Sequence, residues 1–358
     1  MLAPKIRTMR LLKNLFYGML LAACGAVLVT ACKKDDAKPD YNSDKSKLKS
    51  LIDSVTLVYN TAVEGTKPGN YSVGSKQPLK TIIDLALQVN TGATYTQENV
   101  DNALLNLRRS AQEFATRLIQ EVSVANLVAQ WKLDGNANDA SGHGRTGQLR
   151  TGWIGSNAAS AVDGGMLPTG APDRFNRANM AYRFAKGAHI EVPYDVSLNP
   201  QSLTISLWLK RDTSYSENYI MSLNRWNGFK FQLQGNNFPF MTFKTGTDYR
   251  DVDANPGVVP QDIWTHVAVS YTSGAMKFYI NGVLVKTANV SGALNTLTAP
   301  INLAIGNQLP KSVYTLTPSD FQYGGQSFFI GSMDDIRFYN TALTDAEVLS
   351  IYTIEMSL

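Results

Sequence analysis

The spacing of hydrophobic residues changes once along this chain of 358 residues. From 47 to about 122, these residues recur at the spacing of an amphipathic helix. From 126 to about 352, they alternate with polar residues in short runs that turn residues separate, a pattern typical of strands. No helical segment lies between these runs, so a parallel βαβ sheet is not expected. The sequence predicts a small helical part followed by a mostly β part.

The helical part contains three amphipathic segments, at 47–62, about 77–90 and about 97–122. Ser75 precedes the second segment and is its expected N-cap, because serine is among the residues preferred there. The connections between the segments are short, which favours antiparallel neighbours. We therefore expect a three-helix bundle over 47–123.

This helical part resembles the FIVAR-type bundle repeats of bacterial extracellular proteins. The resemblance rests on four motifs, at 62–65 (AVEG), 68–71 (PGNY), 74–75 (GS) and 96–101 (TQENVD). It implies a spacer that lifts the following domain away from a membrane. A second binding surface is the alternative.

The β part contains eight clear alternating runs. Asn281-Gly282 separates two of them and predicts a type I′ hairpin, because both central residues of that turn need a positive φ. A domain over 126–354 suits a two-sheet antiparallel jelly roll, in which closure protects the strand edges. The runs are 127–133, 204–209, 229–233, 240–243, 265–271, 276–280, 283–286 and 301–305.

Blocks of the β part are similar, in the same order, to laminin-G-like domains of the concanavalin A-like class. The resemblance implies a jelly-roll sandwich over 126–354 whose ligand is a glycan or a surface protein. The blocks include 127–135 (LVAQWKLDG), 139–144 (DASGHG), 203–209 (LTISLWL), 264–268 (WTHVA), 276–283 (MKFYINGV) and 331–340 (GSMDDIRFYN).

Glycosidases of the laminarinase type use the same sandwich and place two Glu and one Asp at alternating positions of one strand. Two carboxylates must flank the scissile bond, about 5–5.5 Å apart in retaining enzymes. The close acidic pairs here are Asp251/Asp253 and Asp334/Asp335, and neither has a Glu nearby. We therefore expect no catalytic residues and no enzyme activity; a glycosidase with another arrangement is the alternative.

Segments rich in aromatic and amide residues form the candidate ligand site. Carbohydrate recognition needs exposed aromatic faces beside hydrogen-bonding side chains. The stretches 215–219 and 224–227 have this composition and are expected between strands, and 236–237 and 248–251 are further candidates. The alternative is that Tyr219 and Trp226 pack beneath the loops. The predicted ligand-binding residues are Trp226, Tyr219, Asn224, Arg225 and Tyr249.

A structural calcium ion is the cofactor that the resemblance implies. Domains of this class often hold Ca²⁺ between an Asp-x-Ser-Gly turn and the start of the last strand, which corresponds here to Asp139 and Asp334. Carboxylate and carbonyl oxygens suit this ion. The alternative is an Asx-turn at Asp139 and a surface ion pair between Asp334 or Asp335 and Arg337.

The N-terminus has the pattern of a secretory signal over 1–31: four basic residues, an apolar run, and small residues before Cys32. The sequence Val29-Thr30-Ala31-Cys32 resembles a bacterial lipobox, which implies lipidation at Cys32. Cys24 also fits the motif, but cleavage there leaves an apolar tail, whereas Cys32 leads into a polar tether over 32–46. An uncleaved transmembrane helix is the alternative.

The residues after Cys32, Lys-Lys-Asp-Asp, are similar to the export signals of surface lipoproteins in the Bacteroidetes. They imply a lipid-anchored protein that faces outward from the outer membrane. The four bases before this point account for the excess of Lys and Arg (33) over Asp and Glu (29), so the rest of the chain is formally neutral. No basic surface for nucleic acid is therefore expected.

Together these features predict a surface-anchored, non-catalytic lipoprotein that binds carbohydrate through its sandwich. An adhesion or scaffold protein that grips another protein is the alternative, because architecture does not by itself determine the ligand. A glycoside hydrolase is the third candidate.

Overall fold

The structure is a computed structural model that describes residues 39–122, 124–225, 227–298, 301–317, 320 and 327–357. The expected signal peptide, the lipidation site Cys32 and the predicted ligand residue Trp226 lie outside these residues. In the described part of the chain, no helix is both long and apolar enough to cross a membrane.

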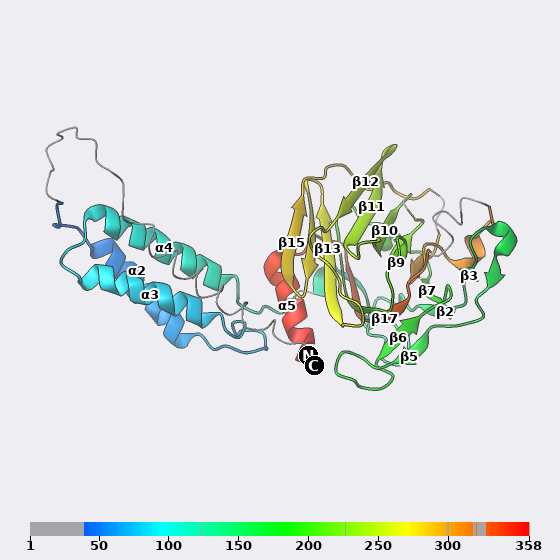
Figure 1. The fold of residues 1–358 in the computed structure, drawn as a ribbon, viewed down its shortest axis with the longest axis horizontal. Coiled ribbons are helices and arrows are strands. Elements are labelled where there is room, and N and C mark those ends of the chain that lie inside the picture. The colour runs from blue at the N-terminus through cyan, green and yellow to red at the C-terminus, as the bar shows by residue number, and fades with distance from the viewer. Residues whose placement is uncertain are drawn as a thin grey trace, which may run out of the picture.

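Three helices form the N-terminal part, as the helical spacing predicts: α2 (Ser46–Thr61), α3 (Lys76–Thr91) and α4 (Gln97–Ala115). They share one hydrophobic cluster, to which each helix contributes buried side chains. Figure 1 shows them lying side by side as an elongated bundle next to the β part. The cluster consists of Leu48, Ile52, Val55, Leu79, Ile83, Ala86, Val100, Leu107 and Phe114.

Two details of this bundle differ from the expectation. The third helix ends at Ala115 rather than near 122, because the chain then turns back toward the first loop: the Ile119 N–H donates to the Asn70 carbonyl at 2.8 Å. The Ser75 side chain does not cap the second helix. Instead, the Glu64 carboxylate accepts a hydrogen bond of 2.7 Å from the first helical N–H, that of Lys76.

The described residues of the β part form two large antiparallel sheets. The eight-stranded sheet has the order β15-β14-β13-β8-β17-β6-β5, with β1 paired to β17; the seven-stranded sheet has the order β12-β11-β10-β9-β16-β7-β2; β3 and β4 form a hairpin. The strands are β1 (Leu127–Trp131), β2 (Gln148–Arg150), β3 (Trp153–Ile154), β4 (Val162–Asp163), β5 (Thr169–Ala171), β6 (Ala181–Phe184), β7 (His189–Val192), β8 (Leu203–Arg211), β9 (Asn218–Leu223), β10 (Phe229–Leu233), β11 (Pro239–Thr245), β12 (Asp248–Asp253), β13 (Thr265–Thr272), β14 (Ala275–Ile280), β15 (Val283–Ala288), β16 (Leu303–Ile305) and β17 (Gly331–Tyr339).

The two sheets pack face to face, which confirms the predicted sandwich. Alternate residues of each strand point inward, such as Ile205 and Leu207 of β8 and Phe229 and Phe231 of β10. These side chains are removed from water and supply the main favourable contribution to folding. The type I′ hairpin is also present, with a positive φ at both Asn281 and Gly282.

A C-terminal helix, α5 (Asp345–Glu355), covers the outer face of the eight-stranded sheet. The alternating pattern of the β part did not predict it. Val348 and Ile351 pack against Ala268 and Tyr279 of the sheet. Figure 1 shows α5 on the side of the sandwich that faces the bundle, and the Gln120 N–H, just after the bundle, donates to the Ser350 hydroxyl at 2.9 Å.

Candidate functional site

The outer face of the seven-stranded sheet carries a row of polar side chains. Strand register places one of these side chains on each strand, opposite the next. On β16 the corresponding residue is apolar, Ala304. Neighbouring strands lie about 4.8 Å apart, so a row across seven strands is roughly 29 Å long. We call this set the polar row: Asp251, Thr242, Lys230, Ser222, Glu191 and Gln148.

Lys230 lies buried at the centre of the polar row. Its Nζ is 3.6 Å from Glu217 Oε2 and 5.4 Å and 5.3 Å from the ring centroids of Tyr219 and Phe240. Burial lowers the pKa of Lys230, and the nearby Glu217 and Asp251 carboxylates only partly offset this effect. A charged lysine in this position is held by one carboxylate and by aromatic faces.

Several buried polar atoms near Lys230 have no hydrogen-bond partner among the described residues. They include Glu217 Oε2, Gln232 Oε1 and the Tyr215 hydroxyl oxygen. Such atoms are costly inside a protein, and in most native structures they bind water, a ligand or another polar group. The centre of this face therefore has hydrogen-bonding capacity that the described chain does not use.

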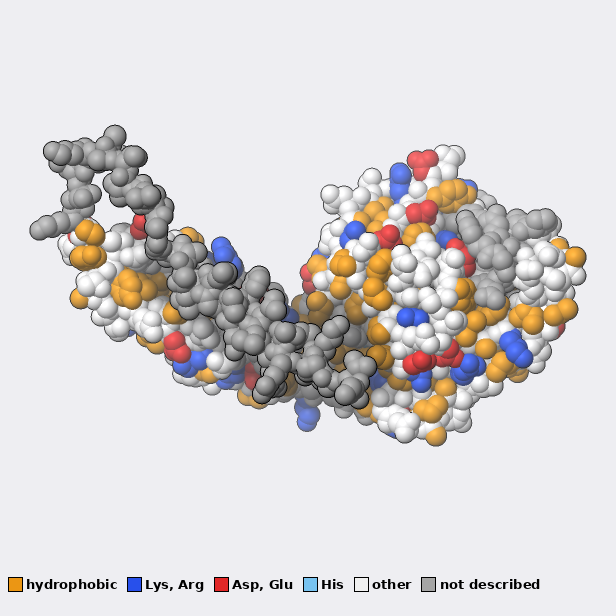
Figure 2. Space-filling model, in the orientation of Figure 1, with side chains coloured by type: hydrophobic (Ala, Val, Ile, Leu, Met, Phe, Trp, Pro, Cys, Tyr) orange, Lys and Arg blue, Asp and Glu red, His pale blue; other side chains and the backbone are white. Residues whose placement is uncertain are grey.

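The polar row reaches solvent at the edge strand β12, where a cleft of about 340 Å³ lies. We call it the β12 cleft; 249–252 of β12 line one side and 289–291 the other. The second segment follows β15, which is the edge strand of the other sheet. The cleft thus lies where the edges of the two sheets meet. Figure 2 shows basic and acidic side chains close together around the tip of the β11–β12 hairpin, at the top of the sandwich.

Tyr249 is the accessible aromatic residue of the β12 cleft. Its side chain is 46% exposed, and Lys244 Nζ of the paired strand lies 5.2 Å from its ring centroid. An exposed ring with a hydroxyl offers both an apolar face and a hydrogen-bonding group. Tyr249 is therefore placed as a platform for a flat, polar ligand.

The other side chains of the cleft add polar groups. Asp251 Oδ1 accepts a hydrogen bond of 2.6 Å from the Thr242 hydroxyl. In the described structure, the Asn289 amide and the Ser291 hydroxyl form no hydrogen bond, and neither does Arg250 Nε, which is buried. Local sequence did not indicate Asn289 and Ser291, because they join the site only through the approach of the two sheets.

The other predicted ligand residues are placed differently. Tyr219 is 1% exposed in the central strand β9, so its ring is packed inside rather than presented, which is the alternative named for it. Asn224 and Arg225 have positive φ and form the turn between β9 and β10. The Arg225 guanidinium is buried and paired with Asp320, so its charge is engaged within the chain. The structure thus brings Tyr219 and Arg225 under the surface and leaves Tyr249 on it.

The two predicted calcium ligands, Asp139 and Asp334, have different hydrogen-bond and ion-pair partners. Asp139 Oδ1 accepts from the Ser141 N–H at 2.9 Å, which is the Asx-turn alternative, and Oδ2 accepts from the Arg145 N–H at 2.9 Å. Hydrogen bonds to Ser141 and to backbone N–H groups lower the pKa of Asp139 despite its burial. Among the described residues, no group of three or more His, Cys, Asp or Glu could hold a metal ion.

Asp334 belongs to a different cluster, under α5. Its side chain is 2% exposed, and Oδ2 lies 2.7 Å from Arg174 Nη1. Burial and the neighbouring Asp335 carboxylate raise the pKa of Asp334 to about 8. The predicted surface pair with Arg337 is wrong, because both aspartates pair with Arg174 while Arg337 pairs with Glu355.

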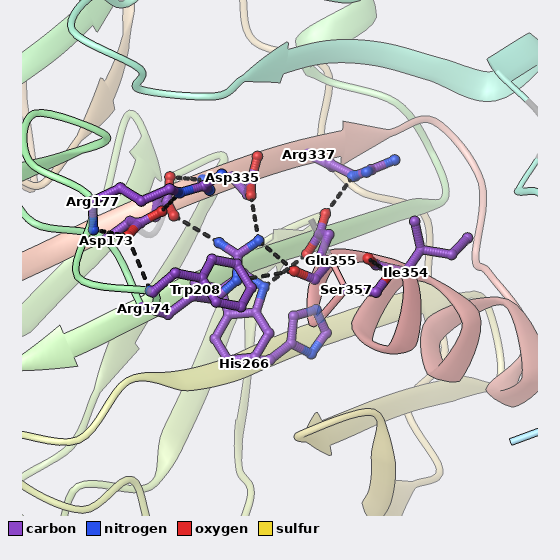
Figure 3. Close-up of polar contacts among 12 residues, drawn as sticks. Asp173, Arg174, Arg177, Trp208, His266, Asp335, Arg337, Ile354, Glu355 and Ser357 are labelled. Carbon is purple, nitrogen blue, oxygen red and sulfur yellow. Dashed lines mark hydrogen bonds and ion pairs between the residues drawn. The ribbon is translucent and has the colours of Figure 1, made fainter. Parts of the chain in front are cut away.

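Glu355 ties the end of α5 to the sheet (Figure 3). Its carboxylate accepts from Trp208 Nε1 at 2.8 Å and from Arg337 Nε at 2.7 Å, and its carbonyl accepts from Arg174 Nη2 at 2.6 Å. Beside it, His266 shares a hydrogen bond of 2.8 Å with Ser206, and burial lowers the pKa of His266 to about 3. These contacts anchor the end of α5 to the eight-stranded sheet.

The family comparison matches the β part of the chain. Residues 184–349 match the family model Laminin_G_3, described as the concanavalin A-like lectin/glucanases superfamily. No curated protein matches the sequence.

Similar solved structures have low identity. Domain 4 of AbnA, a GH43 extracellular arabinanase from Geobacillus stearothermophilus, in complex with arabinotriose, is 21% identical over 63% of this chain and 98% of that chain, with a TM-score of 0.47. The binding domain of Paraclostridial Mosquitocidal Protein 1 is 17% identical over 64% and 52%, with a TM-score of 0.44. The binding domain of Botulinum Neurotoxin DC in complex with SialylT is 16% identical over 64% and 51%, with a TM-score of 0.43. The two sheets and the matched family model make the β part of this chain a concanavalin A-like jelly-roll sandwich.

Proposed function

We propose that the sandwich is a non-catalytic carbohydrate-binding domain and that its ligand lies in the β12 cleft against Tyr249. The observation that carries this proposal is the exposed Tyr249 ring beside unused hydrogen-bonding groups in a cleft of about 340 Å³. Sugar rings have apolar faces and a rim of hydroxyls, so they need an aromatic surface and polar groups together. Asp251, Asn289 and Ser291 supply acceptors and donors of this kind.

A binding role also agrees with the state of the nearby carboxylates. Glycoside hydrolysis needs an acid and a second carboxylate that face the scissile bond from both sides. Here the Asp251 carboxylate accepts from Thr242, and Glu217 lies beside the Lys230 ammonium. Both groups are engaged within the chain, so we favour binding over hydrolysis.

Surface anchoring is the second element of the proposal. We infer that Cys32 carries the lipid, that 33–46 is a tether, and that the α2–α4 bundle, as a FIVAR-like spacer, holds the sandwich away from the outer membrane. The lipobox-like sequence supports the anchor, and the elongated bundle beside the sandwich in Figure 1 supports the spacer. Mass spectrometry of the purified N-terminus tests the anchor: an unprocessed Met1 without acyl mass contradicts it.

A protein-binding scaffold is the other candidate function. The bundle supports it, because Leu57, Leu85 and Leu105, one on each helix, are each more than half exposed and offer apolar surface for a contact. In that case the bundle, rather than the β12 cleft, is the binding part. Binding experiments with variants of each part separate the two functions.

The test is a glycan array with the full chain, followed by Tyr249→Ala. We expect the substitution to weaken glycan binding about tenfold, which is about 1.4 kcal/mol, because the stacking surface is lost. Tyr41→Ala is the matched control, since Tyr41 is 47% exposed but lies before the bundle. Wild-type protein that binds no glycan, or equal binding by both variants, contradicts the proposed site.

A further inference from the structure

We infer that the β12 cleft selects glycans that carry an anionic group, either a uronic acid carboxylate or a sulfate, and that Arg250 binds this group. The inference rests on the proposed function, because it names the ligand class of the same site. It concerns a part of the cleft that stacking on Tyr249 does not explain. Three steps support it: the unused donors of Arg250, the polar groups opposite, and the arrangement of charges on β12.

Arg250 lines the cleft with most of its hydrogen-bonding capacity unused. Its Nε is buried and has no partner among the described residues, although a guanidinium has five N–H donors. The closest carboxylate is that of Asp248, whose Oδ2 lies 3.6 Å from Nη2, beyond the range of a good hydrogen bond. The side chain is 38% exposed, so a ligand in the cleft can reach it. A planar guanidinium in this state suits a carboxylate or sulfate.

The opposite side of the cleft supplies neutral donors. The Asn289 amide and the Ser291 hydroxyl face the same space as Arg250, and in the described structure neither forms a hydrogen bond. A carboxylate or sulfate has several lone pairs and accepts more than the two bonds that one guanidinium edge provides. An arginine, an amide and a hydroxyl around one cleft are therefore a donor set for an anionic oxygen group.

Of the acidic residues of β12, Asp248 forms a long ion pair of 3.6 Å with Arg250, whereas in the described structure Asp251 and Asp253 form no ion pair with it. Successive side chains of a strand point to opposite faces, and Val252 packs on the core side, so Arg250 lies on that side and Asp251 and Asp253 on the other. The Asp251 carboxylate accepts from Thr242, and Asp253 accepts from the Asn255 N–H at 3.0 Å. Their charges are thus stabilised by donors away from Arg250.

The experiment measures binding of the full chain to oligosaccharides of matched length from three classes: neutral glucans, uronates such as oligogalacturonate, and sulfated galactans such as carrageenan fragments, which carry no uronate. The variants are Arg250→Gln, Arg250→Lys and, as the matched control, Arg183→Gln. Arg183 is 42% exposed and pairs with Asp212, outside the cleft. Equal melting temperatures of the four proteins show that the variants are folded.

We expect wild-type protein to prefer an acidic class, with affinity that falls as salt rises. Arg250→Gln should weaken binding of that class about ten- to a hundredfold, whereas Arg250→Lys should restore part of it and Arg183→Gln should change nothing. Whether the uronate or the sulfated fragment responds identifies the anionic group.

Two outcomes overturn the inference, and they differ in whether the proposed carbohydrate site remains valid. If neutral glucans bind as well as acidic ones and Arg250→Gln is silent while Tyr249→Ala weakens binding, the anionic specificity is wrong and the carbohydrate site stands. If none of the three classes binds and the glycan array is also blank, the proposed function is wrong and the inference falls with it.

Discussion

The two sheets of the sandwich have outer faces of opposite kinds. The eight-stranded sheet is covered by α5, and charged groups beneath the helix have partners there, as Glu355 has in Arg337 and in the indole N–H of Trp208. In the described residues no helix covers the seven-stranded sheet, and several of its buried polar atoms have no partner there. The comparison teaches that a polar outer face is not in itself a binding site. The difference lies in how far the chain already uses its hydrogen bonds: the carboxylates beneath α5 have partners, although His266 Nδ1 there has none among the described residues.

The largest effect is expected from breaking the covered face. Glu355→Ala removes the acceptor for Trp208 Nε1 and leaves the largely buried Arg337 without its carboxylate. Breaking a buried pair in this way costs about 3–5 kcal/mol of unfolding free energy. Denaturant unfolding of the full chain measures it, with Glu121→Ala, an exposed position just after the bundle, as the control. A loss below about 1 kcal/mol contradicts an anchoring role for Glu355.

The pH dependence of stability tests the same face at Asp334. Its folded pKa, about 8, lies above its ordinary value, so between pH 7 and 8 the folded chain holds a proton that the unfolded chain has released. Stability should therefore fall as pH rises through this range, by at most about 1.4 kcal/mol per pH unit. The buried histidines do not obscure the effect, because the pKa of an unfolded histidine is about 6.5 and both states are neutral above it.

Asp334→Asn provides the matched variant, because asparagine cannot release a proton. Its melting temperature should fall less between pH 7 and 8 than that of the wild type. The fall that remains near pH 7 belongs to Glu355, whose pKa burial raises to about 7. If the melting temperatures of both proteins change equally with pH, Asp334 is already ionised in the folded state. In that case the ion pair with Arg174 lowers its pKa more than burial raises it.

The smallest effect is expected on the seven-stranded sheet. Gln232→Leu removes a buried oxygen, Oε1, that has no partner among the described residues, and one hydrogen bond of 3.2 Å from Nε2 to the Ser216 carbonyl, so the unfolding free energy should fall by about 1 kcal/mol or less. Ser206→Ala on the other sheet removes the partner of buried His266 and should cost more, about 1–3 kcal/mol. Equal losses in the two variants contradict the difference between the faces.

Sequence patterns identified the helices and the central strands because hydrophobic periodicity reports which side of an element is buried. They did not identify β9 and β12 as strands. The segment of β9 is buried throughout, and β12 is polar at most positions, so neither shows a clear alternation. For the same reason, α5 was not expected. The helix packs against the face of a sheet, but its apolar residues do not form one regular stripe along the sequence.

For the candidate site, the sequence by itself determined the residue types: tyrosines beside Asn, Arg and Asp in two segments, 215–219 and 248–251. Tertiary structure alone decided which tyrosine is available. Tyr219 lies in a central strand under its neighbours, whereas Tyr249 lies on an edge strand, and strand order depends on contacts far apart in the chain. Composition does not specify which strands are neighbours, so neither the approach of Asn289 to Arg250 nor the pairing of Arg174 with Asp334, 160 residues away, can be read from local sequence.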